Sequence, residues 1–394
     1  MVCCRTRSVS SPESTGPRGY DVGVRSVVPI LAMCASACAF QVDAATGDDL
    51  PPGRGCAWTT SRELVFANQT RPETLVSFPV LVVLEDGVNF DYTTSAPDGE
   101  DLRFLDADGH ALAYEIERWN PPKPSYIWVG VPAIAASSGT DHIWMDYGNR
   151  AAAPAQDRTG VWAHGYVAVW HLGEDPTLGT VADSSPDPND AQGMPLMRAP
   201  TSVDGRIAAG IALDGIDDRL SVTSDVSLNL VDLTLEAWVR VTAPAQLGWH
   251  TILEHDRNGP SWYGLWTSSD SPGHFHFRWS GAGDPRMDFT VPFVADAWHY
   301  VAGTLDATAH VAHTYQDGFP DRTDTNPTAP AVTTVKPLTI GENTTDAEPF
   351  RGALDEVRIS NVARSAVWIN AQHASMTNSF VSFGAPVPPV LCPP

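Results

Sequence analysis

The stretch YIWVGV at residues 126–131 alternates between two sets of side chains. Ile127, Val129 and Val131 form one set, and the residues between them form the other. Because successive side chains of a β-strand point to opposite faces of a sheet, this period of two predicts a strand with one face in a core. Helix-period patterns are nearly absent elsewhere, so the chain is predicted to be all-β.

Further short apolar segments flank this stretch between residues 58 and 150. They are Leu64–Ala67, Phe78–Leu84, Leu102–Leu105, Leu112–Trp119 and Ile143–Tyr147. Asp-Gly pairs at residues 86–87, 98–99 and 108–109, which favour tight turns, separate several of them. Together with residues 126–131, these segments predict a small antiparallel β-sandwich over residues 58–150.

A second series of short strands is predicted between residues 160 and 384. Its members are Val167–Trp170, Ala212–Asp214, Leu220–Val222, Leu233–Val241, Thr251–Glu254, Trp262–Thr267, His274–Trp279, Trp298–Leu305, Val311–Gln316, Leu338–Gly341 and Leu354–Ile359. This spacing is typical of two stacked antiparallel sheets. Ser365 is a suitable N-cap for a short closing helix. The Ala-rich joint at 151–158 is short of apolar residues, so each domain is expected to fold separately.

Residues 1–38 are predicted to be an export segment. An apolar stretch of about ten residues suits the h-region of a secretory signal and is too short to span a bilayer. The sequence Ala-Ser-Ala-Cys at 35–38 resembles a bacterial lipoprotein processing box, in which Cys38 becomes lipidated. A plain signal peptide cut after Ala37 is the alternative. Because a long polar stretch precedes the apolar one, translation is expected to start later than Met1.

Two cysteines would bracket the folded region of the mature chain. Cys56 lies near the end of a polar spacer at 39–57, and Cys392 lies in a Pro-rich tail at 385–394. In an oxidising compartment the two can form a disulfide if the chain ends meet, which would stabilise the fold by about 4 kcal/mol. The alternative is that both lie in tails that never meet.

The charge balance excludes one large class of partner. The chain has 394 residues, of which 47 are acidic and 24 basic, for a formal net charge of −23. Its lysines are Lys123 and Lys336 alone. A surface that follows nucleic-acid phosphates needs clustered Lys and Arg, so nucleic-acid binding is not expected. An acidic balance favours solubility and association with divalent cations.

The first domain carries an ordered set of short motifs. They are FPVLV at 78–82, DGEDLRF at 98–104, YEIE at 114–117, IWV at 127–129 and YGN at 147–149. In this order they resemble an uncharacterised bacterial domain family whose members precede laminin G-like modules in exported proteins. The resemblance implies no activity, because none is assigned to that family.

The second domain carries its own ordered set. Its motifs are LDGIDDRL at 213–220, LEAWV at 235–239, WHYVA at 298–302, YQDG at 315–318, GALDEVRI at 352–359, and then RS at 364–365 and WI at 368–369. In this order they resemble laminin G-like, or concanavalin A-like, jelly rolls. The resemblance implies a jelly-roll sandwich, ligand recognition in general, and often one calcium ion near a sheet rim.

Jelly rolls of this superfamily include glycoside hydrolases, which need two carboxylates about 5 to 10 Å apart across a cleft. The strand motif Glu-x-Asp-x-x-Glu of jelly-roll glucanases is missing from the sequence. Glu115 and Glu117 lie in the wrong domain, and the neighbours Asp355 and Glu356 are expected to point to opposite faces. The sequence also lacks a Gly-x-Ser-x-Gly elbow. We therefore predict that the chain is not an enzyme.

One calcium ion is the expected cofactor. Alternation along 353–359 would place Asp355 on the apolar side of its strand, where an unpaired charge needs a metal or several hydrogen-bond donors. Asp183 and Asp217 offer further oxygen atoms, which are the ligands that calcium prefers. The alternative is that Asp355 only ties down a neighbouring loop through hydrogen bonds.

Two tryptophans are candidates for ligand binding. Trp249 and Trp262 are flanked by Gly, His, Pro and Ser at strand ends, so they are expected to be exposed. The apolar C–H face of a sugar packs well against such a ring. His274 and His276 are expected to lie on the wet face of a strand rather than in a zinc site.

These observations predict an exported, non-enzymatic binding or adhesion module of a bacterial cell envelope. Its partner would be a glycan or an envelope protein, and it would touch a membrane only through a lipid anchor. The alternative is a structural or assembly component of the envelope. A glycoside hydrolase-like enzyme ranks third.

Overall fold

The structure, a computed structural model, describes residues 57–193, 198–243, 248–256, 262–280, 285–327, 336–343 and 348–387. All of them belong to one compact unit of the chain. The export segment 1–38 with Cys38, and the disulfide candidates Cys56 and Cys392, lie outside the described residues. In the part of the chain that is described, we find no helix long and apolar enough to cross a membrane.

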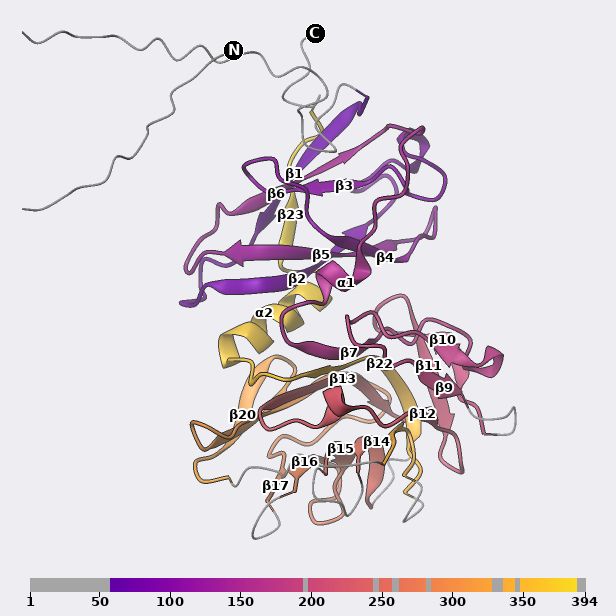
Figure 1. Cartoon of the computed structure of the whole chain (residues 1–394), viewed down its shortest axis with the longest axis vertical. Coiled ribbons are helices and arrows are strands. Elements are labelled where there is room, and N and C mark those ends of the chain that lie inside the picture. The colour runs from indigo at the N-terminus through magenta and orange to yellow at the C-terminus, as the bar shows by residue number, and fades with distance from the viewer. Residues whose placement is uncertain are drawn as a thin grey trace, which may run out of the picture. The chain divides into compact units, whose positions relative to one another are not determined.

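The first sandwich consists of two antiparallel sheets (Figure 1), with strand orders β23-β1-β6-β3 and β2-β5-β4. Its strands are β1 (Thr60–Phe66), β2 (Leu75–Leu84), β3 (Arg103–Leu105), β4 (Tyr114–Arg118), β5 (Ser125–Ile134), β6 (His142–Tyr147) and β23 (Val381–Phe383). The six strands predicted from residues 58–150 are all present, and the prediction of a β-sandwich is confirmed. The short helices η1 (Tyr92–Thr94) and α1 (Arg158–Val161) lie outside these sheets.

Strand β2 explains how this sandwich meets the rest of the chain. Every residue from Phe78 to Leu84 is buried. A strand with one wet face would alternate, so continuous burial means that both faces of the sheet β2-β5-β4 are covered. The amide of Leu81 donates a hydrogen bond to Oγ of Ser375, 2.8 Å away in helix α2 (Ala366–Met376). Helix α2 of the second domain therefore packs on a sheet of the first.

The second sandwich also has two antiparallel sheets. One has the order β10-β11-β22-β13-β18-β19-β20, with β7 paired to β22, and the other has the order β17-β16-β15-β14-β21-β12-β9-β8. The first sheet contains β7 (Tyr166–Trp170), β10 (Thr201–Asp204), β11 (Ala209–Asp214), β13 (Leu233–Val241), β18 (Trp298–Asp306), β19 (Val311–Gln316), β20 (Phe319–Asp324) and β22 (Arg351–Ser360).

The second sheet contains β8 (Thr180–Val181), β9 (Ala191–Gly193), β12 (Leu220–Val222), β14 (His250–His255), β15 (Tyr263–Thr267), β16 (Phe275–Trp279), β17 (Arg286–Asp288) and β21 (Leu338–Ile340), with helices η2 (Pro176–Leu178) and η3 (Val226–Leu228) in its loops. All eleven strands predicted from the sequence are present. The short strands β8, β9, β10, β17 and β20 were not predicted, because two to six residues carry too little pattern.

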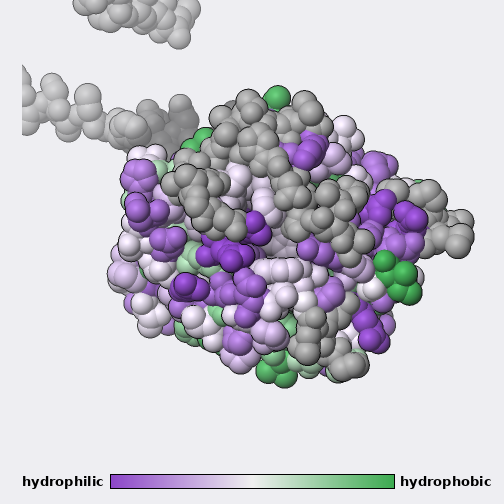
Figure 2. Space-filling view, turned by 90° about the horizontal axis from the view of Figure 1, so that it is seen from below, coloured by the Kyte–Doolittle hydropathy of each residue, from purple (hydrophilic) through white to green (hydrophobic). Residues whose placement is uncertain are grey.

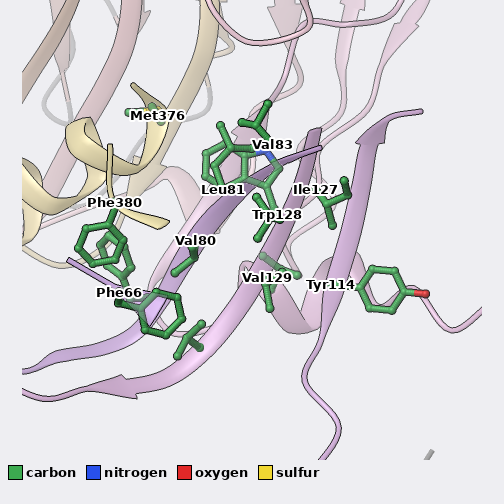
Figure 3. Packing of buried hydrophobic residues seen from close by; sticks show 14 of the residues in the cluster. Phe66, Val80, Leu81, Val83, Tyr114, Ile127, Trp128, Val129, Met376 and Phe380 are labelled. Carbon is green, nitrogen blue, oxygen red and sulfur yellow. The ribbon is translucent and has the colours of Figure 1, made fainter. Parts of the chain in front are cut away.

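The end of the described chain returns to the first sandwich. Strand β23 pairs antiparallel with β1, with Leu64 opposite Phe383, and Figure 1 shows the two side by side. Residues 381–383 fall within the predicted second domain (160–384), yet they extend a sheet of the first. Phe380 stacks on Phe66 with ring centroids 5.9 Å apart, and Figure 3 shows this contact. One hydrophobic cluster accordingly contains residues of both sandwiches.

Helix α2 begins where the sequence predicts. Oγ of Ser365 accepts a hydrogen bond from the amide of Trp368 at 3.0 Å, which confirms Ser365 as the N-cap. The same hydroxyl donates to the carboxylate of Glu73, in the loop before β2, at 2.7 Å. This N-cap therefore also ties the helix to the first sandwich.

Candidate functional site

A group of charged side chains lies where β4 of the first sandwich meets the second sandwich. Glu115 and Glu117 of β4 face the same side, where both lie beside one histidine. His171, which follows β7, has Nε2 3.2 Å from Oε2 of Glu115 and Nδ1 3.7 Å from Oε2 of Glu117. Its Nδ1 also lies 2.8 Å from Oε1 of Glu356 on β22. We call Glu115, Glu117, His171 and Glu356 the junction cluster.

The junction cluster is almost closed to solvent. The exposed fraction of the side chain is 9% for His171, 3% for Glu117 and 1% for Glu356. Glu115, Glu117 and His171 line a cavity of about 450 Å³ whose wall also includes Ser184. Residues of both sandwiches thus line this open cavity.

Glu115 is held as a carboxylate by donors from the second domain. Trp162 Nε1 donates to its Oε2 at 2.6 Å, and Ser184 Oγ donates to its Oε1 at 2.7 Å. Burial works against the charge, but His171 and these hydrogen bonds outweigh it and lower the pKa of Glu115. Burial by itself would lower the pKa of His171. The carboxylates of Glu356 and Glu115 face the ring and favour its charged form, so they raise the pKa of His171 well above its usual range.

Glu117 has fewer partners. Trp128 Nε1 donates to its Oε2 at 2.7 Å, while its buried Oε1 has no hydrogen-bond partner among the described residues. Burial, together with the nearby carboxylate of Glu356, raises the pKa of Glu117 to about 8. Near neutral pH this carboxyl group therefore keeps its proton while Glu115 does not.

Glu356 is paired with a buried arginine. Arg358 Nε donates to Oε2 of Glu356 at 3.0 Å, and the guanidinium lies 4.4 Å from the ring centroid of Trp128 and 4.6 Å from that of Trp162. Burial opposes ionisation, but His171 and Arg358 lower the pKa of Glu356 to about 2. The cluster thus combines a protonated carboxyl group with carboxylates, as general acid–base catalysis requires. Carboxylate oxygen and imidazole nitrogen atoms are also common ligands of divalent cations.

A bulge in β22 brings Glu356 to this place. Its φ is +52°, in the left-handed region, and the pairing register of β22 with β13 shifts at this point. Leu354 and Val357 both lie in the core of the second sandwich, although a regular strand would turn them to opposite faces. The two residues between them, Asp355 and Glu356, consequently both leave the core. The prediction that these two carboxylates point to opposite faces is wrong.

The same bulge corrects the predicted position of Asp355. The sequence placed it on the apolar side with Val357 and Ile359, whereas those two residues lie in the core and Asp355 faces away from it. Its Oδ2 accepts a hydrogen bond from the amide of Ile207 at 2.7 Å. Burial and the nearby Glu356 raise the pKa of Asp355 well above its usual range. This contact agrees with the alternative role, in which Asp355 ties down a neighbouring loop.

The three predicted calcium ligands do not meet. Among the described residues, the groups of acidic and histidine side chains close enough to share an ion are Asp106 with Asp108 and His110, Glu117 with His171 and Glu356, and Asp214 with Asp217 and Asp218. Asp183 instead accepts hydrogen bonds from the amides of Val169 and Ser185, each at 2.8 Å. Of the three predicted ligands, only Asp217 belongs to such a group, and calcium binding stays a prediction.

Aromatic and charged side chains gather on the outer face of the sheet that contains β14 to β17. Phe275, Phe277 and Trp279 of β16 point into the core, so His276 and Arg278 between them point outward. The molecule seen from this side is largely hydrophilic where its residues are described (Figure 2). His276 is nonetheless buried, and its Nδ1 lies 2.7 Å from Oδ1 of Asp288, so the prediction of a wet strand face is wrong at this residue.

The two candidate tryptophans lie on this outer face. Trp249 is half-buried, and its ring centroid is 4.6 Å from that of His276. Trp262 is only 7% exposed, and the guanidinium of Arg278 lies 4.0 Å from its ring centroid. The expectation that Trp262 is exposed is therefore wrong.

Comparison with known families agrees with this architecture. Residues 214–370 match the family described as the concanavalin A-like lectin/glucanases superfamily. The second sandwich is a concanavalin A-like domain. Residues 98–166 match a domain of unknown function, DUF2341, which precedes the concanavalin A-like domain along the chain. Both resemblances inferred from the sequence motifs are confirmed.

Several solved structures are similar to this chain. The binding domain of Paraclostridial mosquitocidal protein 1 is 15% identical, with 54% of this chain and 53% of that chain covered and a TM-score of 0.44. Domain 4 of AbnA, an extracellular arabinanase of Geobacillus stearothermophilus solved with arabinotriose, is 18% identical, with 52% and 97% covered and a TM-score of 0.43. The receptor-binding domain of botulinum neurotoxin mosaic serotype C/D is 12% identical, with 53% and 50% covered and a TM-score of 0.42.

The match spans about half the length of the two toxin domains. No curated protein matches the chain.

Sequence reasoning missed the junction cluster. The pair Glu115 and Glu117 was noticed and set aside because it lies outside the concanavalin A-like domain. His171 carries no motif signal, and its partners lie 56 and 185 positions away along the chain. One usable signal was the continuous apolar run of β2, which indicates a sheet covered on both faces and hence a buried junction.

Proposed function

We propose that the chain is an exported binding protein whose concanavalin A-like domain recognises a carbohydrate. The observation that carries this proposal is the group of aromatic side chains on the outer face of the sheet with β14 to β17. Trp249, Trp262 and Trp266 lie outside both hydrophobic core clusters; Trp249 is half-buried, whereas Trp262 and Trp266 are buried.

These rings form a continuous set. Trp262 and Trp266 meet edge to face with centroids 5.9 Å apart, and Trp266 is 6.1 Å from the ring of His276, against which Trp249 packs. Arg278 and Asp288 supply charged hydrogen-bonding groups beside the rings. A flat indole packs against the apolar face of a sugar while such polar groups bond its hydroxyls. The half-buried Trp249 is therefore the residue that we expect to touch the ligand.

A glycan-array screen of the purified chain, followed by titration with the best glycan, tests the proposal. We expect Trp249→Ala to weaken binding about two- to twelvefold, since one aromatic contact contributes about 0.5–1.5 kcal/mol. Trp144→Ala is the matched control, because Trp144 is an equally half-buried tryptophan on β6 of the first sandwich and should leave affinity unchanged.

Three results would overturn the proposal: no glycan bound by the folded chain, equal binding by Trp249→Ala and the wild type, or equal losses from both substitutions. Capture of an envelope protein without any glycan would instead favour the structural or assembly role.

Export is part of the proposal and has its own test. We expect mass spectrometry of the mature protein to find an N-terminus at Cys38 with a lipid, or just after Ala37 without one. Recovery of the chain with an unprocessed Met1 would refute both.

A further inference from the structure

The junction cluster brings together oxygen and nitrogen atoms that can bind a metal, from three separate parts of the chain. One imidazole nitrogen and two carboxylates, from His171, Glu117 and Glu356, offer ligand atoms that all lie within 4.8 Å of one another. We propose that these three residues bind one Zn²⁺ ion between the DUF2341 domain and the concanavalin A-like domain.

The distances suit an ion of this size. Zinc bonds to nitrogen and oxygen are about 2.0–2.2 Å long, so the ligand atoms of a tetrahedral site lie about 3.4 Å apart. Nδ1 of His171 is 2.8 Å from Oε1 of Glu356 and 3.7 Å from Oε2 of Glu117, which are values on either side of that distance. All three ligand atoms lie within 4.8 Å of one another, so they can converge on one ion.

A second observation points to a missing ligand. Oε1 of Glu117 is buried and has no hydrogen-bond partner among the described residues, although a buried carboxyl oxygen without a partner is costly. Glu117 and His171 also line the 450 Å³ cavity, so a water molecule or a bound ligand can reach a fourth coordination position. Three protein ligands and one open position are typical of reactive rather than purely structural zinc sites.

Hydrogen bonds from neighbouring residues orient the ligands, as they do at most metal sites. With Nδ1 on the metal, Nε2–H of His171 donates to Glu115 Oε2 at 3.2 Å, in a carboxylate–histidine–metal arrangement. Glu115 is itself fixed by Trp162 and Ser184, and Arg358 holds the second oxygen of Glu356. Trp128 Nε1 donates to Oε2 of Glu117, so each ligand group has a partner that fixes its direction.

The net charge of the cluster and its ligand atoms favour zinc over calcium. With an ion bound, Glu117 is ionised like Glu115 and Glu356, and His171 is neutral, so the three carboxylates and Arg358 leave two negative charges that a dication balances. Calcium takes six to eight oxygen ligands, whereas an imidazole with two carboxylates suits zinc. The site therefore differs in chemistry from the all-oxygen group of Asp214, Asp217 and Asp218.

The test uses the full chain, freed of metal with a chelator and then titrated with Zn²⁺ by calorimetry, with metal content measured after gel filtration. We expect one Zn²⁺ per chain. Glu117→Gln and His171→Gln should each weaken binding at least 100-fold, and Glu115→Gln should weaken it about 10- to 100-fold through the orientation of His171. Asp217→Asn is the control, since it alters the other acidic group and should leave Zn²⁺ binding unchanged.

Circular dichroism verifies that each variant folds. Co²⁺ bound to the wild type provides a second measurement that depends on no variant, because four-coordinate Co²⁺ with nitrogen and oxygen ligands gives strong visible absorption bands. Absence of Zn²⁺ and Co²⁺ binding by the folded wild type would overturn the proposal. So would Zn²⁺ binding that survives Glu117→Gln and His171→Gln in folded protein, or that disappears in Asp217→Asn.

Discussion

Arg358 is fully buried between the indole rings of Trp128 and Trp162, and Glu356 is its ion-pair partner. A buried ion pair contributes little net stability, but the loss of one partner leaves the other charge unpaired in a dry environment. Removal of Glu356 is therefore expected to be costly, because it would leave the charge of Arg358 unpaired between the two rings.

A pH dependence follows from Glu117 in the metal-free protein. Its pKa is about 8 in the folded chain and 4.5 in the unfolded one, so the unfolded state releases the proton first as pH rises. Stability should fall between pH 4.5 and 8 by a few kcal/mol, and the raised pKa of His171 acts in the same direction above pH 6.5. Glu117→Gln, which resembles the protonated form, should flatten this fall and be the more stable protein at pH 8. Urea unfolding in the presence of a chelator, at pH 5 and at pH 8, measures the free energy of unfolding of both proteins. An equal change in this free energy between the two pH values for the wild type and for Glu117→Gln would contradict the prediction.

Asp355 allows a second test at the residue scale. Its hydrogen bond from Ile207 predicts that Asp355→Ala lowers the free energy of unfolding by about 1–3 kcal/mol, because a buried amide loses its acceptor. The loss should be the same in calcium and in chelator. A loss seen only in calcium would show instead that Asp355 binds the ion.

Among the elements, the segment from α2 to β23 links the two sandwiches. Helix α2 covers β2, Phe380 packs between the rings of Phe66 and Phe78, and β23 extends the sheet beside β1. The predicted second domain thus supplies part of the hydrophobic cover of the first.

Phe380→Ala tests this link. Removal of a buried phenylalanine costs about 3–5 kcal/mol, and here the cavity would open in the first sandwich although the residue follows the concanavalin A-like domain. Hydrogen exchange should accelerate most in β1 and β2. Phe319→Ala is the control, since Phe319 is 64% exposed on β20 and its loss should change little. Faster exchange confined to the concanavalin A-like domain would contradict the assignment.

For the whole molecule, the shared hydrophobic cluster bears on whether the two domains fold separately. If each domain folds separately, the isolated segment 58–150 should unfold cooperatively at the same temperature as the first domain does in the full chain. The structure leads us to expect otherwise, because residues 58–150 without α2 expose the outer face of β2-β5-β4, and without β23 they expose the edge of β1. Calorimetry should show one transition for the full chain and a lower melting temperature for residues 58–150. Two independent transitions at unchanged temperatures would show that the junction contributes no stability.

The sequence by itself determined the features that consecutive residues encode. Alternation at 126–131 identified β5, Ser365 marked the start of α2, and ordered motifs identified the concanavalin A-like domain, since a strand period or a helix cap involves residues within a few positions of one another. Only the tertiary structure decided the junction cluster. A bulge at Glu356 reversed the facing of Asp355, and packing brought Glu115 and Glu117 to His171 and Glu356 from distant parts of the chain. Such contacts depend on how two sheets stack, and no local pattern specifies that.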